Sequence, residues 1–136
     1  ATCNSYNGGL IPHLKNAESA SIINTVSISA RTGGSAGSSI YSATKAFVST
    51  YTKALARELA PHSIRANAIS PGTVSTDFHK RYSTEEKLEN TRLSIPLQRL
   101  GTPEDCAAAY VFFASEKLSG YVTGQVLEVN GGQLIC

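Results

Sequence analysis

The stretch Ser21-Ile-Ile-Asn-Thr-Val-Ser27, a glycine- and serine-rich connection and then Tyr41-Ser-Ala-Thr-Lys45 together decide the fold. Residues 21–27 are mostly apolar, as in a parallel strand that helices cover on both faces. From Ile40 to Ala60 apolar side chains recur every four residues, and Pro61 ends the predicted helix. The recurring residues are Ala43, Phe47, Tyr51, Leu55 and Leu59. A strand followed by a loop and a long helix predicts an α/β fold.

Tyr41 and Lys45 have the spacing and chemistry of an acid–base pair. Tyrosine is a poor acid or base at neutral pH because its unperturbed pKa is about 10. A lysine at i+4 lies on the same helix face, and its positive charge favours the phenolate. Ser27, at the end of the predicted strand, would hold the oxygen that gains or loses a proton. These residues predict proton transfer on an alcohol or carbonyl oxygen.

Tyr-x-x-x-Lys alone is a weak motif, because an aromatic residue beside a lysine on a helix surface produces the same spacing. The residues downstream favour the catalytic interpretation. Ile64-Arg-Ala-Asn-Ala-Ile-Ser-Pro-Gly72 and Thr73-Val-Ser-Thr76 follow the helix, and Gly124-Gln-Val-Leu-Glu-Val-Asn-Gly-Gly132 comes near the end. The order of these segments identifies a family.

The chain resembles the short-chain dehydrogenases/reductases, in their short single-domain subgroup, from about Pro12 to Gly132. The resemblance is carried by motifs in the family's order. They are the strand with Ser27, Tyr41-x-x-x-Lys45, Asn67 before Pro71-Gly72, Thr76, Leu100-Gly-Thr-Pro-Glu-Asp105 and Gly120-Tyr-Val-Thr-Gly124 leading to Val129-Asn-Gly-Gly132. The resemblance implies a Rossmann-like doubly wound parallel sheet that binds NAD or NADP.

The family's opening Thr-Gly-x-x-x-Gly-x-Gly turn does not occur in this sequence. Thr32-Gly33-Gly-Ser-Ala-Gly37 has a serine in place of the last glycine and is followed at once by Tyr41, so we interpret it as a loop. Asn4 and Asn7 lie too close to Pro12 to match the family's active-site asparagine. We therefore expect residues 1–136 to be the C-terminal half of one NAD(P)-binding domain, inactive by itself.

Composition favours a globular chain and excludes several classes of function. Hydrophobic residues make up 41% of the 136 residues and charged residues 16%, and the net charge is +2. No basic stripe predicts nucleic-acid binding, and no apolar run has membrane-spanning length. The three cysteines and three histidines lack metal-ligand spacing, so we expect no metal site. The cysteines are interpreted as reduced thiols of a cytoplasmic protein.

The remaining elements follow from local signals. Residues 1 to about 18 resemble the tail of a helix that ends near Pro12 and the polar stretch from Lys15 to Ser19. Residues 64–70 and 126–129 are predicted strands. Ser83-Thr-Glu-Glu86 has the form of a capping box before a helix over residues 85–93. Thr102 is a predicted N-cap, with Pro103 first in a helix that reaches about Ser115. Residues 73–95 form an insertion that the resemblance identifies as a substrate lid.

The resemblance assigns roles to individual residues. Tyr41 transfers the proton, Lys45 also binds the nicotinamide ribose, and Ser27 binds the substrate oxygen, with Ser29 as the alternative because neither serine has the usual family spacing. The remaining implied contacts are Pro71, Gly72, Val74 and Thr76 for the cofactor, and Phe78 and Tyr82 for the substrate.

The expected function is NAD(P)-dependent hydride transfer to or from a small-molecule secondary alcohol or ketone. The nearest kinds are 3-oxoacyl-thioester reductases and sugar or polyol dehydrogenases. An inactive fragment or interaction protein that keeps the family's oligomerisation helices is the alternative from another class. We expect a homo-oligomer, a dimer or tetramer, formed through the helix over residues 40–60. Its contact face would comprise Ala46, Ser49, Thr50 and Ala54, and Leu134-Ile135 would form an apolar tail.

Overall fold

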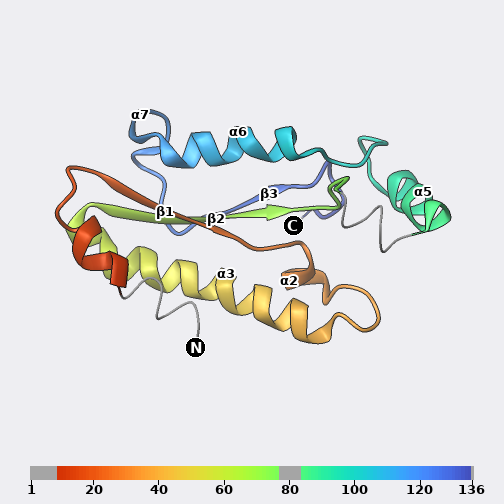
Figure 1. Ribbon diagram of the computed structural model, residues 1–136, viewed down its shortest axis with the longest axis horizontal. Coiled ribbons are helices and arrows are strands. Elements are labelled where there is room, and N and C mark those ends of the chain that lie inside the picture. The colour runs from red at the N-terminus through yellow and green to blue at the C-terminus, as the bar shows by residue number, and fades with distance from the viewer. Residues whose placement is uncertain (1–8, 77–83, 136) are drawn as a thin grey trace.

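The computed structural model describes residues 9–76 and 84–135. Three parallel strands in the order β1-β2-β3 form one sheet (Figure 1). The elements in chain order are β1 (Ala20–Thr25), α2 (Ser29–Thr32), α3 (Ser39–Leu59), the 3₁₀ helix η1 (Ala60–His62), β2 (Ile64–Pro71), α5 (Glu85–Ser94), α6 (Pro103–Ala114), α7 (Glu116–Ser119) and β3 (Val126–Val129).

The two long helices cover opposite faces of the sheet (Figure 1). Helix α3 connects β1 to β2 and packs through Leu55, Ala56 and Leu59 against Ile64 and Ala66. Helix α6 lies on the other face, where Ala109 and Phe113 pack against Ile69 of β2. Parallel strands with crossover helices on both faces confirm the predicted doubly wound α/β sheet.

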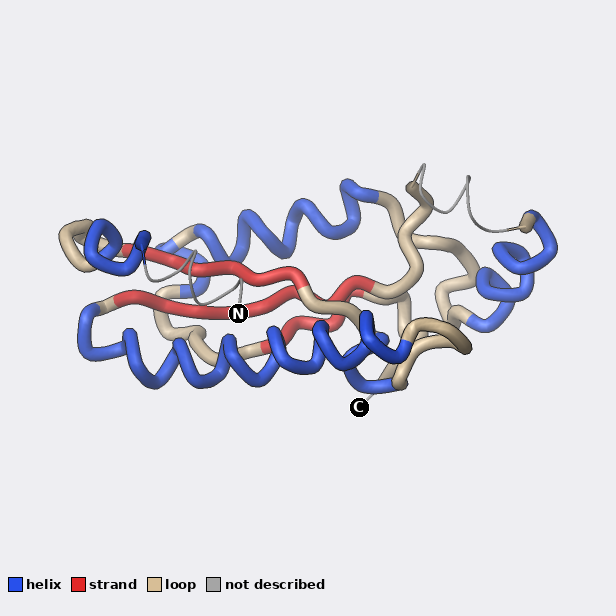
Figure 2. The backbone as a smooth tube through the Cα atoms, turned by 60° about the horizontal axis from the view of Figure 1, so that its bottom comes forward, coloured by secondary structure: helices blue, strands red, loops and turns tan. Residues whose placement is uncertain are grey.

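The carboxyl ends of the strands, α2, the start of α3 and α5 lie at the same end of the molecule (Figure 1), and the second view shows the same elements from another side (Figure 2). Strands β1 and β2 pair from Ala20 opposite Ile64 to Thr25 opposite Ile69. Strands β2 and β3 pair from Ala68 opposite Val126 to Pro71 opposite Val129. The register therefore brings the residues that follow each strand together at this end of the sheet.

The buried face of α3 differs from the predicted one. Leu55 and Leu59 are buried, but Phe47 is 53% exposed and stacks on Tyr51. A repeat of four residues rotates about 40° per step around a helix of 3.6 residues per turn, so its N-terminal members turn toward solvent. The buried side chains are Ser42 near the start of the helix and, in its second half, Thr52, Leu55, Ala56 and Leu59, which are spaced three or four residues apart as on one helix face.

Two buried polar residues of β2 tie the sheet to the chain that precedes β3. Asn67 is fully buried, donates to Val122 O at 2.9 Å and accepts from Gln125 N at 3.0 Å. Arg65 is 7% exposed, and its guanidinium donates to Glu116 Oε2 at 3.0 Å and to Phe113 O at 2.9 Å. These bonds fix the segment between α6 and β3 against the central strand.

Several element boundaries differ from those predicted. Residues 9–14 are helical, and this helix ends just before the polar residues 15–19 as predicted, whereas other boundaries shift. The N-cap of α5 is Thr84, which accepts from Lys87 N, so the predicted Ser83–Glu86 capping box is wrong by one residue. The N-cap at Thr102 is confirmed, and Asp105 completes a reciprocal capping box. The short helices α2 and α7 were not predicted, because single turns carry little periodic signal.

Candidate active site

The predicted site residues lie around the carboxyl end of the sheet, where open α/β sheets bind their ligands. Ser27 and Ser29 follow β1, Pro71 ends β2, and Tyr41 lies in the first turn of α3. The segment 28–39, predicted to be a loop, contains α2 and then Gly33, Gly34 and Gly37, all with positive φ. The chain here joins a strand to the following helix, as predicted for this serine- and glycine-rich stretch.

Tyr41 and Lys45 lie together on one face of α3. The Lys45 Nζ atom lies 5.7 Å from the centroid of the Tyr41 ring. The same ammonium donates to Thr25 O, at the end of β1, at 2.9 Å. Tyr41 is 49% exposed, so its phenol is open to an incoming molecule. The bond to Thr25 fixes the cation beside the tyrosine and connects α3 to the sheet.

Ser27 does not close the strand as predicted. Strand β1 ends at Thr25, but the chain stays bonded to β2 beyond it, since Val26 N donates to Ile69 O at 2.8 Å and Ile28 N donates to Pro71 O at 3.3 Å. The Ser27 hydroxyl accepts from Ser29 N at 3.2 Å, and this turn leads into α2. Ser27 therefore lies between two residues that still bond to β2, and Ser29 is the first residue of α2.

The two serines face different cavities. Ser27 lines a cavity of about 240 Å³ beneath α3, with Ser70 and Glu128. Ser29 lines a larger groove of about 460 Å³, together with residues of α5. Of the two serines, Ser29 therefore borders the groove beside α5, which belongs to the predicted lid over residues 73–95, and Ser27 does not.

Pro71-Gly72 forms a close contact between β2 and the chain after β3. Gly72 N donates to Val129 O at 3.0 Å, and a Cβ built on Gly72 would lie 2.7 Å from Asn130 Cβ. A side chain at this position would force the two segments apart. Glycine is therefore required here by packing within the chain itself.

Val74 and Thr76 follow this turn. Val74 forms a parallel bridge with Gly101, in which Gly101 N donates to Thr73 O at 3.0 Å and Ser75 N donates to Gly101 O at 2.8 Å. In a parallel bridge the N–H and C=O of the bridged residue itself point away from its partner. The Val74 backbone groups are thus directed to the side opposite Gly101. Thr76 is half-buried, and Phe78 and Tyr82 lie outside the described residues.

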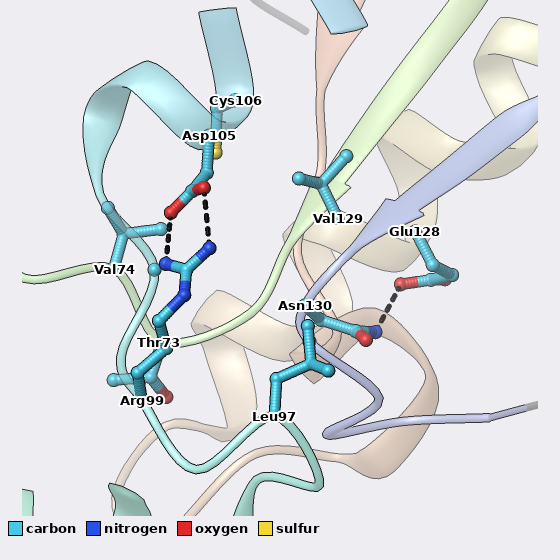
Figure 3. Close-up of a pocket in the computed structure, with 11 residues that line it drawn as sticks. Thr73, Val74, Leu97, Arg99, Asp105, Cys106, Glu128, Val129 and Asn130 are labelled. Carbon is cyan, nitrogen blue, oxygen red and sulfur yellow. Dashed lines mark hydrogen bonds and ion pairs between the residues drawn. The ribbon is translucent and has the colours of Figure 1, made fainter. Parts of the chain in front are cut away.

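Sequence reasoning missed the polar cluster at the N-terminus of α6 (Figure 3). Arg99 binds Asp105 through two hydrogen bonds of 2.6 and 2.8 Å, beside a cavity of about 250 Å³. The Arg99 guanidinium and then the Thr102 N–H hold the pKa of the Asp105 carboxyl well below its usual range. Burial, with the nearby charge of Asp105, raises the pKa of the Cys106 thiol. Arg99 and Asp105 are six residues apart with a turn between them, so the three- or four-residue spacing of helical ion pairs does not predict their contact.

The predicted assembly face of α3 is only partly exposed. Thr50 and Ala54 are exposed, but Ala46 and Ser49 are half-buried and line the cavity beneath α3 with Ser70 and Glu128. Small side chains on α3 thus serve packing near the sheet as well as the outer surface. Within the described ranges, no helix has both the length and the apolar character needed to cross a bilayer.

The sequence model of the family described as Enoyl-(Acyl carrier protein) reductase matches residues 9–133. The chain belongs to the short-chain dehydrogenase/reductase family. The 3-oxoacyl-[acyl-carrier-protein] reductase FabG of Chlamydia pneumoniae is 46% identical over 131 residues, which cover 96% of this chain and 50% of that protein. The chloroplastic NADPH-dependent aldehyde reductase 1 of Arabidopsis thaliana is 40% identical over 125 residues, which cover 92% of this chain and 42% of that protein.

Solved structures agree with the sequence comparisons. The crystal structure of a 3-oxoacyl-[acyl-carrier protein] reductase with bound NAD from Brucella melitensis matches with a TM-score of 0.83 at 34% identity. The match covers 93% of this chain and 45% of that one. The chain spans about half the length of the short-chain dehydrogenases/reductases that it matches. The family resemblance stated from the motifs is thereby confirmed, together with the doubly wound sheet.

Proposed function

We propose that the complete protein is an NAD(P)-dependent oxidoreductase that interconverts a secondary alcohol and a ketone. One observation carries this proposal: the Lys45 ammonium is held by Thr25 O at 2.9 Å and lies 5.7 Å from the centroid of the Tyr41 ring. A fixed cation beside an accessible phenol stabilises negative charge on the phenolic oxygen. This arrangement suits a tyrosine that repeatedly takes up and releases a proton.

The described residues fit a nicotinamide cofactor at the end of the sheet. The Lys45 ammonium has further protons to donate to ribose hydroxyls, and the Val74 backbone offers a donor and an acceptor directed away from Gly101. Pro71, Gly72 and the Thr76 hydroxyl complete the set assigned to the cofactor. Among relatives, one is NADPH-dependent and another contains bound NAD, so both dinucleotides are proposed.

The proposed reaction assigns proton transfer to this chain. Bound NAD(P) accepts a hydride from the alcohol carbon or supplies one to the carbonyl carbon. In reduction Tyr41 gives its phenolic proton to the carbonyl oxygen, and in oxidation the phenolate takes the proton from the alcohol. Lys45 stabilises the phenolate in both directions. Ser27 or Ser29 donates to the substrate oxygen and fixes its place, and Phe78 and Tyr82 are proposed substrate contacts.

The proposed substrates are 3-oxoacyl thioesters or sugars and polyols. The first class follows the FabG relatives, and the hydroxyl-lined groove beside Ser29 favours the second. We further propose a cytoplasmic homo-oligomer, a dimer or tetramer, that uses α3 as a contact. The chain on its own is proposed to be inactive. An interaction protein without activity that keeps the family's oligomerisation helices is the second candidate.

Hydride transfer in the complete protein tests the proposal. Purified protein is incubated with NADPH or NADH and with acetoacetyl thioesters, neutral sugars or uronates, and cofactor oxidation is followed at 340 nm. The proposal expects substrate-dependent oxidation with at least one pairing. If both dinucleotides bind and no carbonyl compound is reduced, the second candidate replaces it.

A further inference from the structure

A groove of about 460 Å³ lies between the residues around α2 and helix α5. This volume lies within the range of about 300–1,000 Å³ that small-molecule sites occupy. The groove reaches Ser29 on one side and Thr73, next to Gly72, on another. A molecule bound in it would therefore contact Ser29, one of the two proposed substrate-binding serines, and lie next to the Pro71-Gly72 turn.

Hydroxyl side chains make up most of the polar lining of the groove. They are Ser29, Thr32, Ser35, Thr73, Thr91 and Ser94. Several of them already bond within the chain, since Thr73 Oγ1 accepts from Gln133 Nε2 and Ser94 donates to Thr91 O. The Ser29 and Ser35 hydroxyls form no such bond within the described ranges. The groove thus offers hydrogen bonds to a ligand that carries hydroxyl groups of its own.

Lys87 is the only charged residue that lines the groove in the described part of the chain. Ion pairs within a helix form between residues three or four apart. The residues at those distances from Lys87 are Ser83, Thr84, Asn90 and Thr91, and none of them carries a carboxylate. Glu89, two residues away, is bound by Arg92 at 2.6 and 2.8 Å. Lys87 forms no ion pair with any residue that the structure describes.

The other two cavities have a different charge balance. The cavity beside α6 contains both Arg99 and Asp105, which bind each other, and the cavity beneath α3 contains Glu128 with Arg31 and Lys53. Each therefore contains acid and base together. Among the described residues, the groove beside Ser29 is lined by one cation, no carboxylate and six hydroxyl side chains, so its chemistry favours an anion that carries hydroxyl groups.

We propose that Lys87 is a specificity residue that binds the carboxylate of a polyhydroxylated carbonyl substrate, a sugar acid of the uronate kind. The inference rests on the proposed function, which supplies the hydride and proton transfer. A carboxylate is favoured over a phosphate because the groove offers a single ammonium and no guanidinium fork. The groove also has apolar side chains at Ile28 and Leu88, but Lys87 and the six hydroxyl groups have no partner on the apolar chain of an acyl thioester.

The test compares kcat/KM of the complete protein for D-glucuronate, D-glucose and an acetoacetyl thioester. A charge-assisted hydrogen bond contributes about 1.5–3 kcal/mol, which corresponds to roughly 10–100-fold in kcat/KM. Wild type should therefore favour glucuronate over glucose by at least about tenfold. Lys87→Met should lose about 10–100-fold on glucuronate and far less on glucose, while Lys87→Arg retains the preference. Lys117→Met, on α7, is the matched control and should behave as wild type.

Binding supplies a readout independent of turnover. With cofactor bound, D-gluconate should bind more tightly than ribitol by calorimetry, and Lys87→Met should abolish that difference. Preference for the thioester, or equal losses on glucuronate and glucose in Lys87→Met, would overturn the inference while leaving the proposed function intact. Absence of hydride transfer to every carbonyl compound, with this binding preference still present, would instead overturn the proposed function.

Discussion

Replacing Asn67 by alanine should destabilise the protein strongly without touching the reacting groups. Asn67 is fully buried in β2 and forms two hydrogen bonds, to Val122 O at 2.9 Å and from Gln125 N at 3.0 Å. The alanine variant leaves Val122 O and Gln125 N without the side chain that they bind. Each unsatisfied buried polar group costs about 1–3 kcal/mol. Water at the partly exposed loop recovers some of this cost. We expect a loss of about 3 kcal/mol in the free energy of unfolding.

Asn67→Asp separates the two bonds. The aspartate keeps an acceptor for Gln125 N but places a second acceptor against Val122 O, and it buries a charge without a cation. When protonated, the carboxyl donates to Val122 O and restores the asparagine pattern. The deficit of Asn67→Asp relative to wild type should therefore be smaller at pH 4–5 than at pH 7.

Urea denaturation of the complete protein at one fixed concentration measures these losses, because association makes stability concentration-dependent. Asn90→Ala, on the exposed surface of α5, is the control and should change stability by less than about 0.5 kcal/mol. At temperatures where Asn67→Ala is folded, kcat/KM should stay within a few-fold of wild type. A loss below about 1 kcal/mol in Asn67→Ala would refute the role assigned to these bonds.

Three further predictions concern the site, the α6 cap and assembly. Lys45→Met should weaken NAD(P)H binding and lower kcat, whereas Lys53→Met on the same helix should do neither. If calorimetry finds unchanged cofactor affinity in Lys45→Met, Lys45 does not bind the nicotinamide ribose. Because the pKa of Asp105 is lowered in the folded state, its carboxylate adds stability above about pH 4 that is lost as the pH falls through the folded value. The melting temperature of Asp105→Asn should consequently lie below that of wild type at pH 7 and converge with it in acid, while Glu104→Gln shows no such trend. Light scattering should find a symmetric homo-oligomer that Ala54→Glu dissociates, and a monomeric wild type would contradict assembly through α3.

The regular elements could be predicted because their signals are local. Residues 126–129 were predicted as a strand and form β3, and Thr102 with Pro103 marks the start of α6 as expected. The position of Tyr41 and Lys45 on one helix face follows from their spacing alone. The family motifs then placed that face at the carboxyl end of a parallel sheet.

Long-range polar contacts could not be predicted in the same way. The bonds of Asn67 reach across more than fifty residues, and those of Arg65 nearly as far, so no periodicity in either segment indicates a partner. Asn67 belongs to a family motif, but its partners Val122 and Gln125 follow only from how β2 lies against the loop that precedes β3. Likewise the bond from Lys45 to Thr25 O depends on how α3 lies over β1.

Turnover of Tyr41→Phe in the complete protein tests the central claim most directly. Phenylalanine keeps the ring beside Lys45 and removes only the oxygen that carries the proton. We predict a fall in kcat of about 10²-fold or more, with NAD(P)H affinity little changed. Near-normal turnover of this variant on the substrate that wild type prefers would contradict the account.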